Sequence, residues 1–430
     1  MYHAYEHYVM SNVELWTERG QRQGVSVEVK EGRIVSLKAD PSTVPHVIDG
    51  RGLCLMPAGV DPQVHLRVPG QAQKETPGTG LLAALRGGIG AVLTMPNTKP
   101  VIDSVEVCEE AVFELEEAQK MTGVRVYLTA ALSRGLKGQE ASDYKALARF
   151  GVKAFTDDGL GVVDDAIMHA AFAASVETGL PILQHAEFPG HGAVLAPGPL
   201  QARLGMPAYP ASAEADMVAR DLKILSQYPG ARYHVLHVSA RETLELVAKA
   251  KEQGLLVTCE VSPHHLWFCA DDIKSDDSSF KMNPPLRSAL DRKALRQGLR
   301  SGLIDFVATD HAPHESEAKS PNFKTAAFGT TGLETSLRVL LSLVDAGELD
   351  AARLVQIFAS RPAEFLGIAE SFGDITEQRE LKAVLVDTKA RSTITETDLF
   401  SLSKNNCFVG TELSGRLEAV FFGERVYRFT

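Results

Sequence analysis

Long apolar runs, disulfide-type cysteine spacing and low-complexity tracts are all lacking in this 430-residue sequence. No run of apolar residues approaches the ~20 residues that cross a membrane, and the first residues contain no apolar stretch typical of secretory signals. The five cysteines are odd in number and include no CxxC pair. Such scattered cysteines are typical of free structural thiols in a reducing compartment. We therefore expect a soluble, cytoplasmic protein.

Positive charge is also in short supply, because 55 acidic residues outnumber 44 basic ones and give a formal net charge of −11. An acidic balance argues against nucleic acid or an anionic membrane as a partner. It does not exclude an anionic small molecule, because one local arginine can outweigh the global field. The apolar content of 44% is ordinary for a folded globular protein.

The two ends of the chain carry short alternating segments that are typical of β-strands. The clearest of them cover residues 25–29, 33–37, 381–387, 417–422 and 425–429. Neither end is long enough to form a stable sheet alone. We therefore expect residues 1–57 and 366–430 to combine in one small β-sandwich unit.

Residues 58–365 show a different rhythm, in which apolar strand-like runs alternate with amphipathic helical stretches. This alternation is typical of βα units and a parallel sheet. The predicted strands cover residues 54–61, 91–96, 125–131, 152–157, 181–186, 233–238, 255–261 and 304–309. Predicted helices include residues 104–121, 164–178 and 211–226. Eight such units predict an α/β fold, a (β/α)8 TIM-type barrel, whose chemistry lies at the C-terminal ends of its strands.

Histidines and an aspartate occur where several predicted barrel strands end. These are His65 after the first strand, His185 on the fifth, His237 on the sixth and Asp310 after the eighth. A single histidine at a strand end is usually a hydrogen-bonded structural residue, but this pattern across four strands predicts a metal centre. Five histidines fall outside this pattern and are expected to be surface or packing residues: His3, His7, His46, His169 and His191. His264, His265 and His311 are expected to be hydrogen-bonding neighbours of the centre.

Gln63 lies two residues before His65, and strand alternation places both side chains on one face. Two histidines at these positions would form half of a metal site. A neutral imidazole nitrogen is a good zinc ligand, whereas a carboxamide oxygen is a poor one. The sequence therefore predicts that this half of the metal centre is weakened.

Several motifs together resemble the dihydroorotases of the amidohydrolase superfamily, in particular the bacterial class I form. They are DPQVHLRVPG at 61–70, MPNTKP at 95–100, FTDDG at 155–159, SPHHL at 262–266, KMNPPLR at 281–287, TDHAPH at 309–314 and FGTTGLE at 328–334. The resemblance spans nearly the whole chain, and the combination of MPNT with DHAPH is specific.

The resemblance implies two metal positions that share a bridging ligand. The implied ligands are His65, Asp158, His185, His237 and Asp310. Asp158 is expected to be the bridge. Lys153 is the alternative, because many relatives use a carboxylated lysine followed two residues later by an aromatic residue. Zinc is the implied cofactor, with one or two ions per chain, and Gln63 favours one.

The resemblance also implies a set of substrate contacts. They are Arg67, Asn97, Asn283, His314, Phe328 and Gly329. A planar guanidinium such as that of Arg67 suits a two-pronged contact with a carboxylate. The implied reaction is the reversible cyclisation of N-carbamoyl-L-aspartate to (S)-dihydroorotate in de novo pyrimidine (UMP) biosynthesis. In the hydrolytic direction, a hydroxide formed from metal-bound water attacks the ring amide carbonyl, and Asp310 acts as the acid/base.

Two further functions remain open from the sequence. One is a catalytically impaired dihydroorotase-like subunit that supports aspartate transcarbamoylase, which Gln63 suggests. The other is an allantoinase or hydantoinase, against which Arg67 and Asn97 argue because they suit a carboxylated pyrimidine ring. The other site residues are retained, which favours an active enzyme. A homodimer and a complex with aspartate transcarbamoylase are the assemblies that the resemblance suggests.

Overall fold

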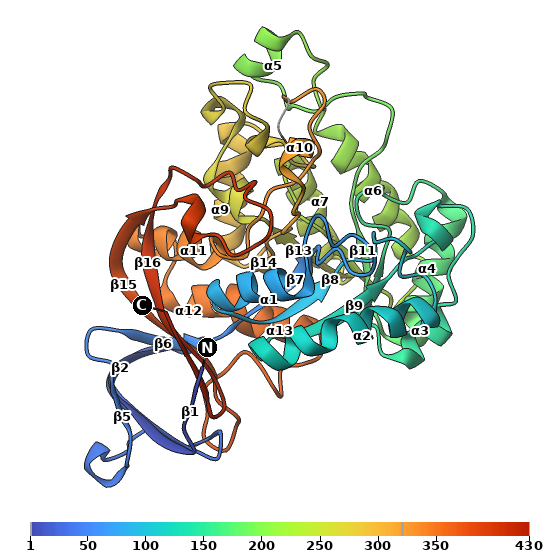
Figure 1. Ribbon diagram of the computed structural model, residues 1–430. Coiled ribbons are helices and arrows are strands. Elements are labelled where there is room, and N and C mark those ends of the chain that lie inside the picture. The colour runs from blue at the N-terminus through green and yellow to red at the C-terminus, as the bar shows by residue number, and fades with distance from the viewer. Residues whose placement is uncertain (1, 320–321, 430) are drawn as a thin grey trace.

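The computed structural model describes residues 2–319 and 322–429 and divides the strands between two sheets (Figure 1). Eight parallel strands form the larger sheet in chain order. They are β7 (Gly59–Val64), β8 (Ile89–Thr94), β9 (Arg125–Ala130), β10 (Ala154–Thr156), β11 (Ile182–Gln184), β12 (Arg232–Val235), β13 (Leu256–Val261) and β14 (Phe306–Val307).

The first and last strands of this sheet approach each other just beyond their ends. Val64 forms an isolated parallel bridge with His311, and the N–H of His65 donates to the carbonyl of His311 at 2.9 Å. The sheet is therefore a nearly closed barrel, which confirms the predicted α/β barrel fold. Closure also brings the residues that follow β7 beside those that follow β14.

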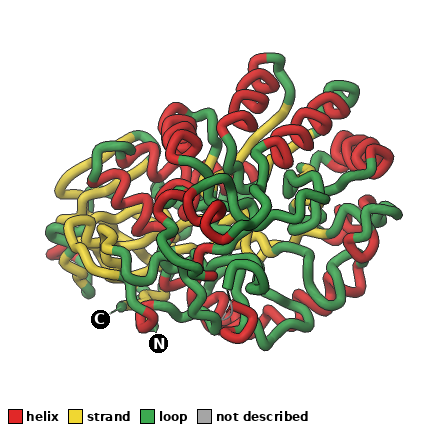
Figure 2. Tube along the Cα trace, turned by 90° about the horizontal axis from the view of Figure 1, so that it is seen from above, coloured by secondary structure: helices red, strands yellow, loops and turns green. Residues whose placement is uncertain are grey.

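Helices surround this barrel (Figure 2). They are α1 (Pro77–Arg86), α2 (Val105–Thr122), α3 (Tyr144–Phe150), α4 (Asp165–Thr178), α5 (Pro199–Leu204), α6 (Ser212–Leu225), α7 (Arg241–Glu252), α8 (Pro263–Trp267), α9 (Ala289–Ser301), α10 (Ser316–Lys319), α11 (Ser336–Asp345), α12 (Ala351–Val355) and α13 (Arg361–Phe365). The three helices predicted from the sequence match α2, α4 and α6 closely.

Local sequence sets the ends of these helices, as α2 illustrates. The Ser104 side chain accepts a hydrogen bond from the N–H of Val107, which caps the first turn. Gly123 ends the helix with a φ of 75°, a left-handed conformation that glycine adopts without a steric penalty.

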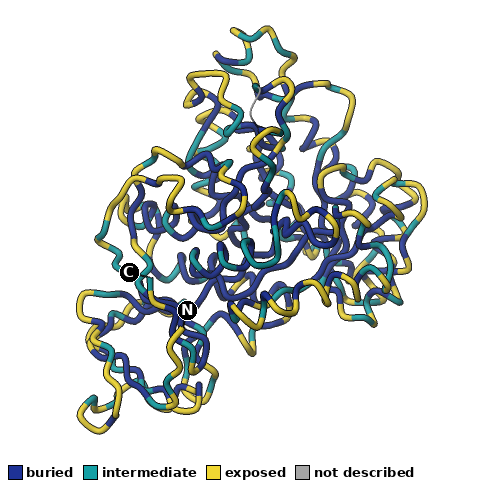
Figure 3. The backbone as a smooth tube through the Cα atoms, in the orientation of Figure 1, coloured by how far each residue is buried: buried dark blue, intermediate teal, exposed yellow. Residues whose placement is uncertain are grey.

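Apolar side chains fill the barrel and close its N-terminal end, and Figure 3 shows the buried residues concentrated through this region. The Phe365 ring lies 5.1 Å from the Phe306 ring and 4.7 Å from the His234 ring. Gly59 has no room for a side chain, because a Cβ there would lie 2.4 Å from the Phe358 ring. With this end plugged, the polar residues gather at the opposite, C-terminal end of the strands.

The second sheet combines strands from both ends of the chain, as predicted (Figure 1). They are β1 (His3–Ala4), β2 (His7–Thr17), β3 (Gly20–Lys30), β4 (Arg33–Ser36), β5 (Val47–Asp49), β6 (Cys54–Pro57), β15 (Lys382–Thr393), β16 (Glu412–Phe422) and β17 (Arg425–Arg428). The Tyr8 hydroxyl donates to the carbonyl of Gly423 at 2.9 Å, and its ring stacks on Phe421. The sandwich-like unit is thus one continuous sheet that encloses its own core.

The prediction of a single first barrel strand at 54–61 was wrong. The structure splits this run into β6, which pairs with β2 and β15 in the second sheet, and β7, which starts the barrel. The break falls at Ala58, whose N–H donates to the carbonyl of Lys382. Both strands are buried along their whole length, so apolar periodicity carries no sign of the change of sheet.

All five cysteines are buried and free, as predicted. Across residues 2–319 and 322–429, no helix combines the length and the apolar character that crossing a membrane requires.

Candidate metal centre and substrate cavity

A cavity of about 290 Å³ lies at the C-terminal end of the barrel strands. Its lining residues are His65, Arg67, Asn97, Asp158, Gly159, His185, His237, Asn283, Asp310, Ala312, His314, Phe328 and Gly329. Every residue that the sequence marks as a metal ligand or substrate contact is among them. The fold therefore brings together positions that lie up to 264 residues apart in the chain, from His65 to Gly329.

Asp158, His185 and His237 form the most compact group in this cavity. They follow β10, β11 and β12, which are neighbours in the sheet, so their side chains meet at one edge. Nδ1 of His185 lies 2.9 Å from Nε2 of His237 and 3.4 Å from Oδ1 of Asp158. Two imidazole nitrogens and one carboxylate oxygen are typical donors for zinc. These three residues therefore fit a metal ion.

The neighbouring half of the cluster has a different donor set. Nε2 of His65 lies 3.1 Å from Oδ1 of Asp310 and 3.2 Å from Oδ2 of Asp158. Gln63 is fully buried, and its amide nitrogen donates weakly to Oδ1 of Asp158 at 3.4 Å. Its amide oxygen is buried without a hydrogen-bond partner. Within the described residues, only Asp158, His185 and His237 approach closely enough for three donors to share one ion.

The charges around Asp158 also favour a bound cation. Burial alone raises the pKa of Asp158, but hydrogen bonds from His185 and His237 and the nearby His65 hold it well below its ordinary value. Burial lowers the pKa of His185, but the carboxylates of Asp158 and Glu187 outweigh burial and raise it to about 10. The carboxylates thus attract positive charge to this point. A metal cation can supply that charge in place of the proton.

Three residues of the cavity have backbone conformations that are uncommon for their type. Arg67, His237 and Asp310 have φ values of 61°, 31° and 48°. Non-glycine residues with positive φ are rare, and such strain is concentrated at functional sites. Here each unusual residue follows a barrel strand, where the backbone turns to direct its side chain into the cavity.

Arg67 and His314 form a pair on the wall of the cavity. One terminal nitrogen of Arg67 donates to Nε2 of His314 at 3.3 Å, and its Nε donates to the carbonyl of Pro313. Burial and then the charge of Arg67 lower the pKa of His314 to about 2, so its ring is neutral at pH 7. Burial also lowers the pKa of Arg67, to about 10. Arg67 is thus a buried cation beside a neutral acceptor, which suits an anionic ligand.

Asn97 makes hydrogen-bond contacts with the half of the cluster that contains His65 and Asp310. Its amide oxygen lies 2.9 Å from Nδ1 of His65, and its amide nitrogen donates to the carbonyl of Asp158 at 3.3 Å. The Nδ1 contact orients the His65 ring so that Nε2 faces the two carboxylates. Asn97 therefore contributes to the placement of His65 as well as to the cavity wall.

Glu187 is a polar contact that the sequence interpretation did not assign. Its carboxylate accepts from Nδ2 of Asn283 at 2.6 Å and lies 3.3 Å from Nε2 of His185. Hydrogen bonds of this kind to the second nitrogen of a ligating histidine fix its ring orientation. The signal was present, because Glu187 is two residues after His185 and so shares its side of the strand end.

His191 and Lys153 are two further residues near the site whose roles were predicted from the sequence. His191 was expected to be a surface or packing residue, but its Nε2 lies 2.8 Å from Oε1 of Glu187, at the edge of the site. Lys153 precedes β10, and its ammonium lies 5.4 Å from the Tyr127 ring, whereas Asp158 follows β10 and joins the cluster. Asp158, and not Lys153, thus lies with His185 and His237 in the cavity.

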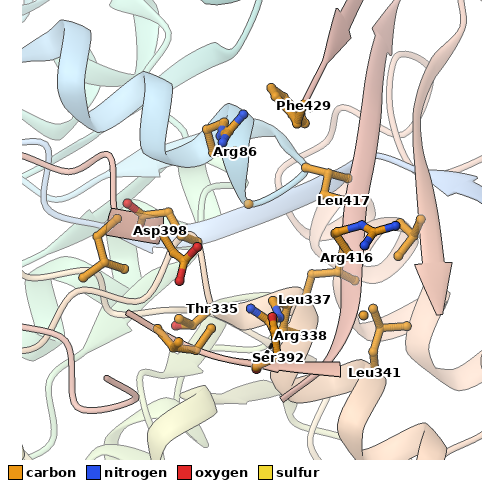
Figure 4. A pocket seen from close by; sticks show the side chains of 16 residues that line it. Arg86, Thr335, Leu337, Arg338, Leu341, Ser392, Asp398, Arg416, Leu417 and Phe429 are labelled. Atoms are coloured by element: carbon orange, nitrogen blue, oxygen red, sulfur yellow. Dashed lines mark hydrogen bonds between the residues drawn. The ribbon is translucent and has the colours of Figure 1, made fainter. Parts of the chain in front are cut away.

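A separate cavity of about 180 Å³ lies between α1, α11 and the C-terminal strands (Figure 4). Two of the arginines that line it, Arg338 and Arg86, already contact other groups of the protein. Arg338 donates to the carbonyls of Ser392 and Leu413, while Arg86 stacks on the Phe429 ring at 4.3 Å. It contains no histidine and shares no residue with the barrel cavity. The chemistry of the chain is therefore assigned to the barrel cavity.

Comparison with known proteins is consistent with this geometry. Residues 54–417 match the model of the Amidohydrolase family. A dihydroorotase from Shouchella clausii is 38% identical over 415 residues, which cover 96% of each chain. A dihydroorotase from Lactiplantibacillus plantarum is 38% identical over 416 residues, or 95% of each chain.

Solved structures with the same fold include two cyclic-amide hydrolases. The L-hydantoinase (dihydropyrimidinase) from Arthrobacter aurescens has a TM-score of 0.87 at 25% identity and covers 98% of this chain and 97% of its own. The dihydropyrimidinase from Brevibacillus agri has a TM-score of 0.86 at 21% identity, with 98% and 95% covered. The sequence is more similar to the dihydroorotases than to these structural neighbours.

Proposed function

Because the chain belongs to the amidohydrolase family, we propose that it is a dihydroorotase, a cyclic-amide hydrolase that interconverts N-carbamoyl-L-aspartate and (S)-dihydroorotate. Relatives that bear this name are 35–38% identical over nearly the full chain. The observation that carries the proposal is the buried Arg67 beside neutral His314 in a cavity with metal-ligating groups. Both substrate forms carry a carboxylate, which such an arginine recognises. The reaction is a step of pyrimidine biosynthesis.

We propose zinc as the cofactor, held tightly by Asp158, His185 and His237. A bound zinc ion polarises a carbonyl and makes water a better nucleophile. His65 and Asp310 complete the predicted ligand set on the side where Gln63 offers only an amide oxygen. Because an amide oxygen is a poor zinc ligand, we propose one tightly bound ion per chain.

The other side chains have roles in binding and proton transfer. Arg67, assisted by Asn97 and His314, receives the substrate carboxylate. Asn283 and the Phe328–Gly329 segment contact the ring. Asp310 takes the proton from the attacking water in the hydrolytic direction and delivers it to the departing ring nitrogen. In the cyclising direction the carbamoyl nitrogen bonds to the side-chain carboxyl carbon, and the same carboxylate takes the proton from that nitrogen and delivers it to the oxygen that departs as water.

One observation favours a second function. Gln63 lies where the resemblance implies a metal-binding histidine, so the alternative proposal is an impaired dihydroorotase-like subunit that supports aspartate transcarbamoylase. The donor set around Asp158, His185 and His237 and the Arg67–His314 pair are nevertheless complete. Complete ligand and substrate groups favour the active enzyme.

An assay on the purified, zinc-loaded protein tests these functions against each other. Cyclisation of N-carbamoyl-L-aspartate and hydrolysis of dihydroorotate are measured beside hydrolysis of allantoin and hydantoin. The proposal predicts turnover of the first pair. Turnover of only allantoin or hydantoin would sink it, and no turnover together with binding of aspartate transcarbamoylase would establish the impaired subunit.

We further propose the predicted division into a terminal β unit, residues 1–57 with 366–430, and a catalytic barrel, residues 58–365. The separation of the strands into a terminal sheet and a barrel sheet supports this division, as does the core that the terminal sheet encloses. A cytoplasmic location, supported by five free thiols, and a homodimer complete the proposal. Size-exclusion chromatography with light scattering tests the oligomeric state, with and without aspartate transcarbamoylase.

A further inference from the structure

Lys319 is a buried lysine close to the substrate cavity that the proposed mechanism does not use. Only 6% of its surface is exposed. Its ammonium donates three hydrogen bonds, to the carbonyls of Lys281 at 3.1 Å, Ala327 at 3.0 Å and Gly329 at 2.8 Å. Throughout the described part of the chain, no carboxylate lies within 4.0 Å of it. A buried cation held only by carbonyl dipoles is costly, because lysine is almost never fully buried unless it is paired.

The three carbonyls enclose one wall of the substrate cavity. Ala327 and Gly329 flank Phe328, and the Lys281 ammonium lies 4.5 Å from the centre of the Phe328 ring. The carbonyls on both sides of Phe328 therefore accept hydrogen bonds from the same Lys319 ammonium. Removing that ammonium would leave its carbonyls without their shared donor.

The backbone of Gly329 is fixed on its other sides as well. Its N–H donates to the carbonyl of Lys281 at 2.9 Å, and its carbonyl accepts a second bond, from Nδ2 of Asn405 at 3.1 Å. Its φ is +131°, and a Cβ would lie 2.7 Å from the Cβ of Ala312. The Gly329 backbone is thus held by three hydrogen-bond partners, and the Lys319 ammonium is one of them.

The charge of Lys319 also acts on His314, whose ring lies beside Gly329. After burial, the cations that lower the pKa of His314 are Arg67, Lys74 and Lys319. Lys319 therefore adds to the positive potential at the place where Arg67 would meet the substrate carboxylate. Such a potential favours an anionic ligand.

We infer that Lys319 is a positioning residue for the substrate, which fixes the Phe328–Gly329 wall and supplies buried positive charge beside the carboxylate-binding end. The role in substrate binding rests on the proposed function. The role in holding the wall rests on geometry alone. The two roles are therefore tested by different measurements.

The first measurement is hydrogen exchange of the segment 322–331 in the full-length protein, read by mass spectrometry. Lys319→Met is compared with Lys324→Met, an exposed lysine of the same segment. We expect at least about tenfold faster exchange around Phe328 in Lys319→Met, because charged hydrogen bonds each contribute about that factor to local stability. The control should exchange like the wild type. Unchanged exchange in Lys319→Met would overturn the inference, whether or not the protein is an enzyme.

The second measurement separates KM from kcat for dihydroorotate. Lys319→Met should raise KM roughly tenfold and change kcat much less, because Lys319 does not touch the reacting atoms. Metal content should stay at the wild-type level. Faster exchange with an unchanged KM would show a merely structural lysine and would contradict the inference. Absence of turnover in the wild type would instead contradict the proposed function and leave the exchange result to decide.

The pH dependence of KM supplies a readout that loss of packing does not produce. Burial lowers the pKa of Lys319 to about 8, with Lys281 and Asp277 as charged neighbours. The Cys407 thiol is also near, but burial raises its own pKa to about 12 and keeps it neutral. The lysine is charged below that pH and neutral above it. Wild-type KM should therefore rise between pH 7 and 9, and the part of this rise due to Lys319 should be missing in Lys319→Met. Identical profiles would overturn the inference.

Asn405→Ala serves if Lys319→Met folds poorly. It removes the second donor to the Gly329 carbonyl and leaves the buried ammonium in place. We expect a smaller increase in exchange and in KM, in the same direction. No change in either quantity would show that the hydrogen bonds to this carbonyl do not position the wall.

Discussion

The two halves of the metal cluster share Asp158 but differ in their other donors. One half has His185 and His237, whose ring nitrogens lie 2.9 Å apart. The other has His65 and Asp310, with Gln63 where a second imidazole would lie. Asn97 orients His65, and Glu187 lies against His185, so both halves are supported by further hydrogen bonds. The two halves therefore differ at the single donor that Gln63 offers, while the hydrogen bonds around both halves are in place.

His237→Ala should have the largest effect, because it removes a nitrogen donor from the complete half. Loss of a mere hydrogen-bonding partner of a ligand costs 10–100-fold in metal affinity or activity, so loss of the ligand should cost more than about 100-fold. Elemental analysis should show loss of the tightly bound ion, and cyclisation should fall with it. His46→Ala, an exposed histidine, is the control. Retained metal in His237→Ala would contradict the proposal that the half containing His185 and His237 holds the tightly bound ion.

Arg67→Met should have the next largest effect, and on the substrate rather than on the metal. A charged, two-pronged contact with a carboxylate is lost, so kcat/KM should fall by about 10- to 100-fold. Metal content should be unchanged, because Arg67 is not one of the three residues that offer metal donors, Asp158, His185 and His237. Arg51→Met, at an exposed turn residue between β5 and β6, is the matched control. A wild-type kcat/KM for dihydroorotate would remove the main support for a carboxylated substrate.

Glu187→Gln should weaken the complete half without removing a ligand. The amide keeps the size of the side chain but loses the charge that faces His185 and Asn283. We expect about a tenfold loss of zinc affinity, measured by competition with a chelator, and a similar rise in KM. Glu109→Gln, exposed on α2, is the control. Unchanged affinity would show that His185 needs no carboxylate to orient it.

Gln63→His should have the smallest effect on activity, but it tests the difference between the two halves of the metal cluster most directly. It restores the imidazole that the incomplete half lacks, so metal content should rise above one ion per chain and cyclisation should increase a few-fold. The position is buried, so thermal unfolding must show that the variant folds like the wild type. Gln227→His tests whether a new surface histidine binds metal by itself. No gain in metal or activity would show that the half is limited by something other than Gln63.

Much of the fold was predictable because local patterns carried it. Apolar runs, helix caps such as Ser104 and turn residues such as Gly123 act over a few residues, so the barrel and its helices follow from them. The border between β6 and β7 was not predictable, because Ala58 lies inside one apolar run that serves two sheets. Pairing with Lys382, more than 300 residues later in the chain, decides where the run divides.

The site was predictable to the extent that its residues follow strands. Parallel strands bring such residues to one edge, so Asp158, His185 and His237 could be grouped in advance. The contacts of Glu187 and Lys319 depend on how long loops fold back over the barrel. No spacing in the sequence encodes that return path, so Lys319 emerged only from the structure, whereas the position of Glu187 two residues after His185 was a signal that the sequence did carry.

The number of tightly held zinc ions per chain tests the central claim most directly. The protein is purified in the presence of zinc, dialysed against buffer without a chelator, and analysed for metal and for cyclisation of N-carbamoyl-L-aspartate in the same sample. We expect one ion per chain, lost in His237→Ala, together with turnover. Two tightly held ions per chain in the wild type would contradict it, because Gln63 would then be an adequate ligand after all.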